Sequence, residues 1–368
     1  MKTAIITDCK YRMSIPAIRA LGRAGYRVIG TQTIAESNGA IPAFSSCYMS
    51  KGCRLEGSVA DPAYKDRLLS LIKEFDHPLL LCIGAATLNL VSLHQAEFSP
   101  YCDFLIAAPE ALDALNDKEQ VHRRAESLSL PIPRQYSGMP DRFPVVMKPH
   151  CGEKLGLSAA ERYTFAYSKE EFLQKLEQIK KYDPAPLVQE KLEGAGKGAC
   201  LLIDQSGALV SAVCHQRIRE YPISGGPSTC CISIYDEKMI HQAYTLLSSF
   251  GFRGMAMVEF KGDAILEVNP RIWGSFPLTE CCNSSFILSY ARAAAGEKLK
   301  YQPADYRQKV RMRFLLNDSI SLLKHLSKGH LLIFLTGLLD CLRAKEALRD
   351  PQDPKPFRQY LRKSLINR

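Results

Sequence analysis

Two acidic side chains and one amide lie at positions where they could hold a metal ion together. Glu259 lies in the apolar run 255–260, and Glu267 and Asn269 alternate along the apolar run 265–269. Because side chains along a strand point alternately to its two faces, Glu267 and Asn269 share a face. Carboxylate and amide oxygens are ligands that magnesium prefers, and Arg271 adds a guanidinium just past the end of the strand.

The connection between the two runs decides whether the first carboxylate joins the other two ligands. A two-residue loop would leave Glu267 on the face opposite to that of Glu259. If all of residues 261–263 form the loop, Glu259 faces Ile265 and joins the other ligands on one face. We predict the three-residue loop. The alternative is an edge hairpin whose acids are solvated.

The segments upstream form an ordered series with this hairpin. Lys148 ends the apolar run 143–147, and the stretch 187–194 reads Leu-Val-Gln-Glu-Lys-Leu-Glu-Gly. The order of these segments resembles that of the ATP-grasp superfamily. It has a lysine strand, a Gln-Glu-x-Leu hinge, an acidic strand and a final Glu-x-Asn-Pro-Arg. The resemblance extends over roughly residues 1 to 300, and the carboxylate-amine ligases, carbamoyl-phosphate synthase large chains and biotin carboxylases of that superfamily are the nearest types.

The resemblance implies an α/β (α+β) chain with four parts. Strands at 3–7 and 26–30, with a helix at 15–24 between them, predict a Rossmann-like parallel sheet in an N-terminal domain, extended by strands at 79–83 and 104–107. The expected parts are this domain (1–108), a first ATP-grasp subdomain with a phosphate-covering loop at 149–158 (109–186), a second subdomain with the metal site (187–300) and a basic helical extension (301–368).

The same resemblance implies which residues bind ATP. Lysines would meet the phosphates, Glu190 would accept from the adenine amino group, and Glu193 or a neighbour would meet the ribose. The residues implied to contact ATP are Lys118, Lys148, Lys154, Gln189, Glu190, Lys191, Leu192 and Glu193. Alternatively, Lys118 is a solvated residue at a helix start, and the two glutamates are surface acids.

A ligase reaction follows from the resemblance. Two magnesium ions, with manganese as the alternative, would be held by Glu259, Glu267 and Asn269. Lys118, Lys148 and either Arg271 or Arg217 would neutralise the charge of the transferred phosphoryl group. A carboxylate would become an acyl phosphate that an amine then attacks. The rival activities are bicarbonate activation, as in carboxylases and carbamoyl-phosphate synthases, and a non-catalytic nucleotide-binding regulator.

Substrate residues are expected in two places. Arg217 and Arg219 alternate on one strand, and a turn that contains Gly225, Gly226 and Ser228 follows, which resembles the segment near the γ-phosphate and substrate carboxylate in carboxylate-amine ligases. The loops of the N-terminal sheet offer the weaker candidates Asp8 and Arg12, for which a structural role in the loop is the alternative. His215 is expected to be a strand histidine, and Trp273 a packing residue.

Composition limits the remaining options. The 13 cysteines are scattered and lack Cys-x-x-Cys spacing, and no signal peptide is seen, so we expect a reducing cytoplasm and no zinc site. The net charge of +10 suits anionic small-molecule substrates. The absence of an aromatic-basic motif argues against nucleic acid. A homodimer is the expected assembly.

The C-terminal region departs from the family pattern. The apolar run 331–339 is too short to cross a bilayer, which needs about 20 such residues. We predict a core helix followed by a solvated basic tail. The alternative is an interfacial helix that makes peripheral contact with anionic lipid.

Overall fold

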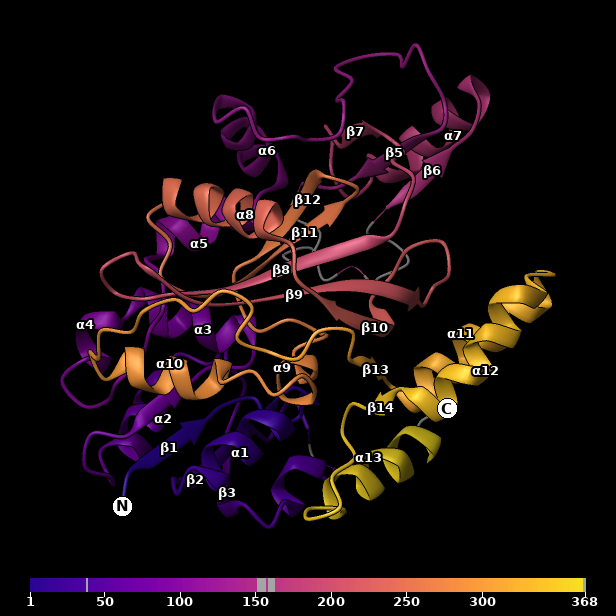
Figure 1. Cartoon of the computed structure of the whole chain (residues 1–368). Coiled ribbons are helices and arrows are strands. Elements are labelled where there is room, and N and C mark those ends of the chain that lie inside the picture. Colours follow the sequence, from indigo (N-terminus) through magenta and orange to yellow (C-terminus); the bar gives the residue numbers. More distant parts are fainter. Residues whose placement is uncertain (38, 151–156, 158–162, 367–368) are drawn as a thin grey trace.

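The computed structural model describes residues 1–37, 39–150, 157 and 163–366. Three β-sheets organise the chain (Figure 1). A four-stranded sheet lies at the bottom of the view, a seven-stranded sheet crosses the middle, and a three-stranded sheet lies at the upper right. The mixed α/β class predicted from the sequence is confirmed.

The N-terminal sheet is parallel, as its strand–helix–strand pattern predicts. Its order is β3-β2-β1-β4. The strands are β1 (Thr3–Ile6), β2 (Arg27–Thr33), β3 (Met49–Leu55) and β4 (Leu79–Leu81). The helices are α1 (Ser14–Arg23), η1 (Pro42–Ser45), α2 (Tyr64–Ile72), α3 (Ala85–Leu93) and α4 (Gln95–Phe98). The strand predicted at 104–107 is wrong, because this segment reaches the sheet only through a single bridge between Asp103 and Leu79.

The three-stranded sheet is antiparallel and is covered by one amphipathic helix. Its order is β6-β5-β7, and apolar side chains such as Val145 and Met147 are buried against Phe172 of the helix. The elements are β5 (Val145–Lys148), β6 (Thr164–Ala166), α7 (Lys169–Ile179) and β7 (Leu187–Glu190). Strand β7 follows the boundary expected at 186, yet it belongs to this sheet.

The seven-stranded sheet has the order β12-β11-β8-β9-β10-β13-β14, and all pairs except β13–β14 are antiparallel. Its long strands are β8 (Gly196–Ile203), β9 (Leu209–Glu220), β10 (Ser228–Ile234), β11 (Gly254–Lys261) and β12 (Ala264–Asn269). The helices near it are α5 (Pro109–Asn116), α6 (Lys118–Ser127), α8 (Glu237–Ser249), α9 (Pro277–Cys281) and α10 (Phe286–Ala294). Helix α10 joins this sheet to the N-terminal one, since the buried Tyr290 hydroxyl donates to the carbonyl of Leu80 in β4 (3.1 Å).

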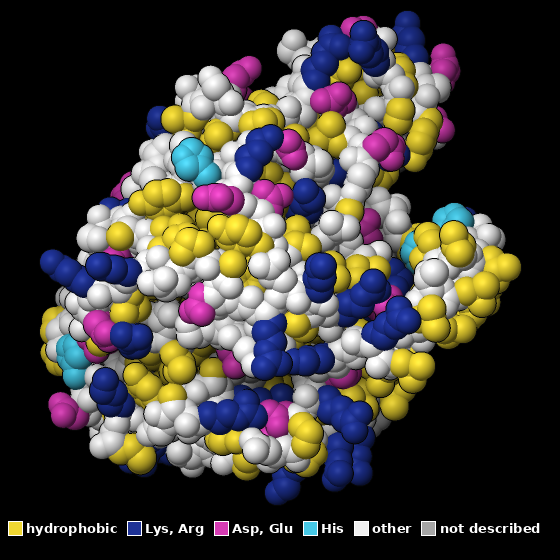
Figure 2. Space-filling model, in the orientation of Figure 1, with side chains coloured by type: hydrophobic (Ala, Val, Ile, Leu, Met, Phe, Trp, Pro, Cys, Tyr) yellow, Lys and Arg dark blue, Asp and Glu magenta, His cyan; other side chains and the backbone are white. Residues whose placement is uncertain are grey.

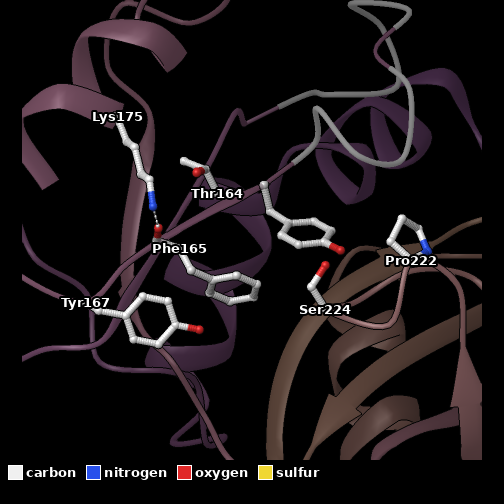
Figure 3. Close-up of a pocket in the computed structure, with 7 residues that line it drawn as sticks. Thr164, Phe165, Tyr167, Lys175, Pro222 and Ser224 are labelled. Carbon is white, nitrogen blue, oxygen red and sulfur yellow. Dashed lines mark hydrogen bonds between the residues drawn. The ribbon is translucent and has the colours of Figure 1, made fainter. Parts of the chain in front are cut away.

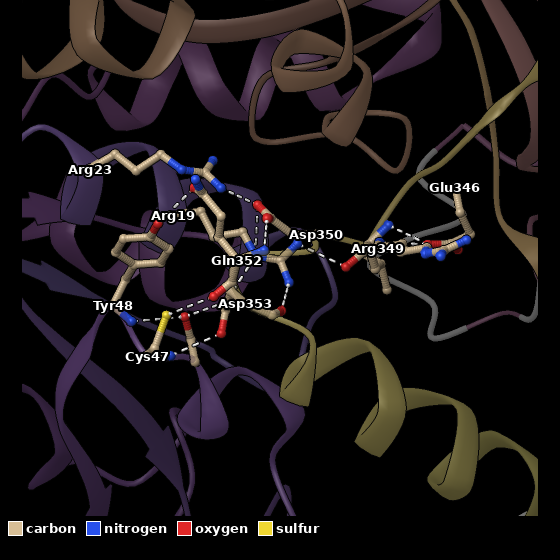
Figure 4. Close-up of polar contacts among 11 residues, drawn as sticks. Arg19, Arg23, Cys47, Tyr48, Glu346, Arg349, Asp350, Gln352 and Asp353 are labelled. Atoms are coloured by element: carbon tan, nitrogen blue, oxygen red, sulfur yellow. Dashed lines mark hydrogen bonds and ion pairs between the residues drawn. The ribbon is translucent and has the colours of Figure 1, made fainter.

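The C-terminal region is built into the fold at its strands and at its last segment. Its elements are β13 (Arg311–Arg313), α11 (Leu315–Ser327), α12 (Leu331–Arg343), β14 (Lys345–Glu346) and α13 (Lys355–Ile366). The predicted solvated tail is wrong at Asp353, which is buried and accepts hydrogen bonds from Arg19 (2.9 Å) and Ser46 (2.7 Å) of the N-terminal domain (Figure 4).

The predicted core helix is also wrong. Of the α12 residues, only Gly337 and Asp340 are buried, while Leu332 is 74% exposed and Leu342 is 88% exposed. Length and apolarity alone therefore did not indicate burial. Among the helices of the described residues, none is both long enough and apolar enough to cross a membrane.

Candidate active site

The two glutamates of the hairpin lie directly opposite each other. Strands β11 and β12 pair Lys261 with Ala264, so the loop contains only Gly262 and Asp263, and the predicted three-residue loop is wrong. Gly262 has φ +60, a conformation that glycine adopts without steric strain.

A β-bulge produces the shared face instead. Phe260 pairs with Ile265, but the next pair is Glu259 with Glu267. Leu266 is therefore the extra, unpaired residue of the bulge. Asn269 joins the same face, because its Nδ2 donates to Glu259 Oε1 (3.1 Å). The predicted grouping of the three side chains is therefore confirmed, although by a different backbone geometry.

A buried histidine that the sequence analysis missed holds this bulge. His122 of α6 bonds through Nε2 to the carbonyl oxygen of Leu266 (2.9 Å) and through Nδ1 to Nε2 of Gln189 (3.1 Å). Burial, together with the charge of Lys148, lowers the pKa of His122 to about 4. The ring is therefore neutral at pH 7 and carries its proton on Nε2. The signal in the sequence was the i, i+4 spacing of Lys118 and His122, which places both on one side of the helix.

Cations surround the two carboxylates. Lys118 Nζ lies 3.3 Å from Glu267 Oε2, and Arg217 forms an ion pair with Glu259. Burial favours the neutral form of Glu267, but the charges of Lys118 and Lys148 outweigh it and lower its pKa to about 2. Burial raises the pKa of Glu259, and Arg217 opposes that shift. Burial also lowers the pKa of Lys148 to about 8.

The lysines are positioned by the ends of regular elements. Lys118 is the first residue of α6, whose N-cap Asp117 accepts from the backbone N–H groups of Glu119 (2.9 Å) and Gln120 (3.2 Å). Lys148 is the last residue of β5, which pairs with β7. Two separate elements thus bring positive charge to the acidic hairpin.

Comparison with known proteins agrees with this arrangement. A family model described as an ATP-grasp domain matches residues 115–275. The chain carries an ATP-grasp domain. No curated protein sequence matches the chain.

Solved structures share the fold of this chain at low sequence identity. One is the biotin carboxylase domain of Hydrogenobacter thermophilus 2-oxoglutarate carboxylase, solved as a dimer in complex with MgADP, ADP and bicarbonate. It is 14% identical to this chain, and its TM-score is 0.64 over 84% of this chain and 73% of that one. Biotin carboxylase from Campylobacter jejuni, as its beta-gamma-ATP complex, is 12% identical, and its TM-score is 0.63 over 84% of this chain and 74% of that one. N5-carboxyaminoimidazole synthetase from Staphylococcus aureus is 16% identical with a TM-score of 0.62 over 89% and 86%.

The hinge of the ATP-grasp domain contains one unpaired buried acceptor. Gln189 is fully buried, and its Oε1 has no hydrogen-bond partner within the described residues. Glu190 Oε1 accepts from the backbone N–H of Arg134 (2.9 Å), whereas Glu193 is exposed and pairs with Lys191 (2.8 Å). Leu192 lies half-buried between them. Lys154, with most of the expected phosphate-covering loop, lies outside the described residues.

The donor set of the hairpin fits a hard divalent cation. Its side-chain donors are all oxygens, from Glu259, Glu267 and the amide of Asn269. Among the described residues, no three His, Cys, Asp or Glu side chains gather as a metal cluster. A bound magnesium ion would therefore complete its coordination with phosphate oxygens and water.

Arg217 connects the carboxylates to the glycine turn. Besides its ion pair with Glu259, its Nη1 donates to the carbonyl of Gly226 (3.3 Å). The neighbouring Gly225 has φ +136 and lies against Tyr163, whose hydroxyl is hydrogen-bonded to Ser224.

A cavity of about 290 Å³ opens beside this turn, between β6 and the β9–β10 connection (Figure 3). Its lining combines aromatic rings and hydroxyl groups, from Tyr163, Thr164, Phe165, Tyr167, Lys175, Pro222 and Ser224. The charge of Lys175 is already engaged, because its Nζ donates to the carbonyl of Phe165 (2.7 Å) and to Glu171 (3.0 Å). The sequence analysis did not single out these aromatic residues.

Arg219 does not lie with Arg217 at the carboxylates. Its side chain is buried and forms a two-pronged ion pair with Asp318 (2.8 Å for both contacts) and a further one with Asp340 (2.6 Å). Ser228, another substrate candidate, is buried and donates to the carbonyl of Cys230 (3.1 Å). Both therefore have structural contacts in place of the predicted substrate contacts.

The candidates in the N-terminal loops are also engaged within the fold. Asp8 is buried and accepts from the backbone N–H of Gly84 (3.0 Å) and the hydroxyl of Thr87 (2.9 Å), which is the structural alternative. The guanidinium of Arg12 lies over the ring of Phe314, 3.4 Å from its centroid. These contacts explain both residues without a substrate.

Three further predicted residues have clear positions. Arg271 follows β12, and its Nη1 donates to the carbonyl of Ile272 (3.0 Å). His215 is buried beside Ser275 (3.2 Å), and burial lowers its pKa to about 3, so it is a strand histidine as expected. Trp273 is buried with two phenylalanine rings, which confirms its packing role.

Proposed function

We propose that the protein is an ATP-dependent ligase that joins a small carboxylic acid to an amine through an acyl phosphate. One observation carries this proposal: two facing carboxylates, Glu259 and Glu267, lie among Lys118, Lys148 and Arg217. Fixed carboxylates next to several fixed cations are what phosphoryl transfer needs, because that chemistry depends on positioning and charge neutralisation.

In this proposal the carboxylates and Asn269 would hold magnesium, which would supply positive charge beside the triphosphate. Lys118 then exchanges its contact with Glu267 for a phosphate oxygen, and Lys148, whose ammonium is already desolvated, contacts the triphosphate at little further cost. We place adenine at the hinge, where Gln189 Oε1 offers an acceptor. The backbone N–H groups of Glu190 and Lys191 already donate to the carbonyls of Arg134 (2.9 Å) and Pro144 (3.1 Å), so the backbone contact with the ring edge is assigned to Leu192.

The reaction has two steps. An oxygen of the substrate carboxylate attacks the γ-phosphorus, the bond from that phosphorus to the bridging oxygen breaks, and ADP leaves with the electron pair. The amine then attacks the acyl carbon, inorganic phosphate leaves, and the amine nitrogen loses a proton to solvent. Arg217 stabilises negative charge on the transferred group from the side of the glycine turn.

The cavity beside the turn is our candidate for the site of the small substrate. Its volume of about 290 Å³ is at the lower end of ligand pockets, which suits a small acid or amino acid. It lies next to Gly225 and Gly226, which adjoin Arg217, so a carboxylate bound at its inner end would lie near the proposed γ-phosphate position.

Isotope transfer tests the proposal directly. The protein is incubated with MgATP, amines and pooled small acids whose carboxylates carry 18O. The 18O content of the released phosphate is then measured by mass spectrometry. An acyl phosphate predicts that one 18O per turnover appears in phosphate, and only when acid and amine are both present. Phosphate release that needs bicarbonate and no other acid supports the carboxylase-type alternative, which the biotin carboxylase neighbours favour. ATP binding with no phosphate release contradicts both.

A further inference from the structure

Helices α11 and α12 form an apolar hairpin that projects from the body of the protein (Figure 1). We define the apolar hairpin as residues 315–343. Figure 2 shows hydrophobic side chains covering much of the projecting lobe at the right. The exposed leucine and isoleucine side chains are Leu323, Leu326, Leu331, Leu332, Ile333, Leu335, Leu338, Leu339 and Leu342. A contiguous apolar surface of this kind marks an interaction site.

The hairpin is held firmly at its base. A Cβ on Gly337 would lie only 2.2 Å from Leu322 Cδ2, so the two helices approach closely there. Asp318 of α11 and Asp340 of α12 are both buried and share Arg219 of β9. The exposed leucines therefore belong to an anchored element and do not result from a frayed end.

The exposed charges of the hairpin and the charges of α13 are all positive. Its two acids, Asp318 and Asp340, are buried and paired with arginines, so its exposed charges are cations, at Lys324, Lys328 and Arg343. Helix α13 continues the pattern with Lys355, Arg358, Arg362 and Lys363 and no acid. An apolar face bordered by cations complements a surface that is both apolar and anionic.

A second copy of the chain fits this surface poorly. A twofold contact between two hairpins brings the same patch of each copy together, so the cations of one would face the cations of the other. A bilayer that contains anionic lipids offers both required features, acyl chains for the leucines and phosphates for the lysines and arginines. Each helix has 13 residues, about 20 Å, which is shorter than the roughly 30 Å hydrocarbon core.

We propose that the outer face of the apolar hairpin docks on the surface of an anionic membrane. The leucines enter the boundary between headgroups and acyl chains, and Lys324, Lys328 and Arg343 contact lipid phosphates. The hairpin lies in the plane of the interface and does not cross it. This inference is independent of the proposed ligase activity, because it rests on other residues.

Vesicle flotation with the full chain tests the proposal. The wild-type protein should float with vesicles of equal phosphatidylglycerol and phosphatidylcholine at 0.1 M salt, and much less with phosphatidylcholine alone. Leu332→Ser/Leu342→Ser should reduce binding at least tenfold. The matched control is Leu93→Ser/Leu173→Ser, which changes leucines that are 68% and 48% exposed elsewhere, and it should bind as the wild type does.

A separate variant tests the contribution of the cations to membrane binding. Lys324→Gln/Lys328→Gln/Arg343→Gln should weaken binding to the anionic vesicles by about 100-fold, since each cation near such a surface contributes about a fivefold factor. Lys169→Gln/Lys180→Gln/Lys181→Gln on and after α7 removes the same charge from exposed positions and should have little effect.

Hydrogen exchange of the wild-type protein gives a readout that needs no variant. Vesicles should slow exchange in residues 315–343 and leave α7 unchanged. The proposal is overturned if the wild type does not bind the anionic vesicles, if it binds neutral vesicles equally well, or if exchange in the hairpin is unaffected. It is also overturned if the Leu332→Ser/Leu342→Ser variant retains vesicle binding but turns a dimeric protein into a monomer, because a second copy would then be the occupant.

Discussion

Glu259 and Glu267 face each other across β11 and β12 because Leu266 is bulged out of the register between them. Without the bulge, the next residue pair after Phe260–Ile265 would place Leu266 opposite Glu259, and the carboxylates would point to different faces. The candidate metal site therefore depends on one extra residue in a hairpin.

His122 should matter because it holds that bulge. His122→Leu removes the hydrogen bond to the Leu266 carbonyl, so we expect the magnesium concentration for half-maximal turnover to rise by about tenfold, as for other residues that orient metal ligands. His122→Gln keeps a donor and an acceptor and should recover part of the loss. An unchanged magnesium requirement in His122→Leu, with the fold intact by circular dichroism, would contradict this positioning role.

Arg217 should affect turnover through charge and geometry together. Arg217→Gln removes the charge next to Glu259 and should lower kcat at least 100-fold, whereas Arg217→Lys, which keeps the charge but not the contact with Gly226, should lose less. Arg292→Gln on α10 breaks an exposed pair with Glu297 and serves as the control. Equal activity of Arg217→Gln and Arg292→Gln would remove Arg217 from the mechanism.

Arg219 should be a stability residue. Arg219→Met leaves Asp318 and Asp340 short of a partner in the interior, and breaking a buried pair costs about 3 to 5 kcal/mol. Urea unfolding should show that loss. The triple variant Arg219→Met/Asp318→Leu/Asp340→Leu should recover much of it, because no buried charge of the trio remains. A single variant as stable as the wild type would mean that the network does not anchor the hairpin.

Glu280 of α9 predicts a pH dependence of stability. Burial raises its pKa from the ordinary 4.5 to about 7, despite the opposing charge of Arg23. Since the folded-state pKa lies above the unfolded one, the contribution of Glu280 is fully present below pH 4.5 and is lost as the pH rises to 7. Glu280→Gln should remove this dependence.

Between pH 5 and 8, the free energy of unfolding of the wild type should therefore fall relative to Glu280→Gln by about 1 to 3 kcal/mol. Urea titrations of both proteins at several pH values measure the difference. A constant difference across that range would show that Glu280 titrates normally.

The sequence predicted the parts of the site that depend on local pattern. Alternation along β12 placed Glu267 and Asn269 on one face, and Lys118 was expected at a helix start, where the structure has it as the first residue of α6. The sequence-based predictions were wrong where contacts between residues far apart in the chain determine the local structure. The bulge at Leu266 is supported by His122, 144 positions away, and such a contact cannot be read from the hairpin itself.

The C-terminal region shows the same limit. The apolarity of α12 suggested burial, but its buried positions are set by the arginine on β9 and by the close approach at Gly337, and most of the leucines remain exposed. Arg219 was likewise grouped with Arg217 from strand alternation, and only the placement of Asp318 and Asp340 shows its partners.

The most direct test of the central claim is the turnover and magnesium-dependent nucleotide binding of Glu267→Gln. The substitution removes one charge from the facing pair and keeps the size of the side chain. We expect the fold to be intact, phosphate release to fall below detection, and a non-hydrolysable ATP analogue to lose most of its magnesium-dependent affinity by calorimetry. Turnover and magnesium-dependent affinity equal to those of the wild type would contradict a metal–triphosphate site at Glu259, Glu267 and Asn269.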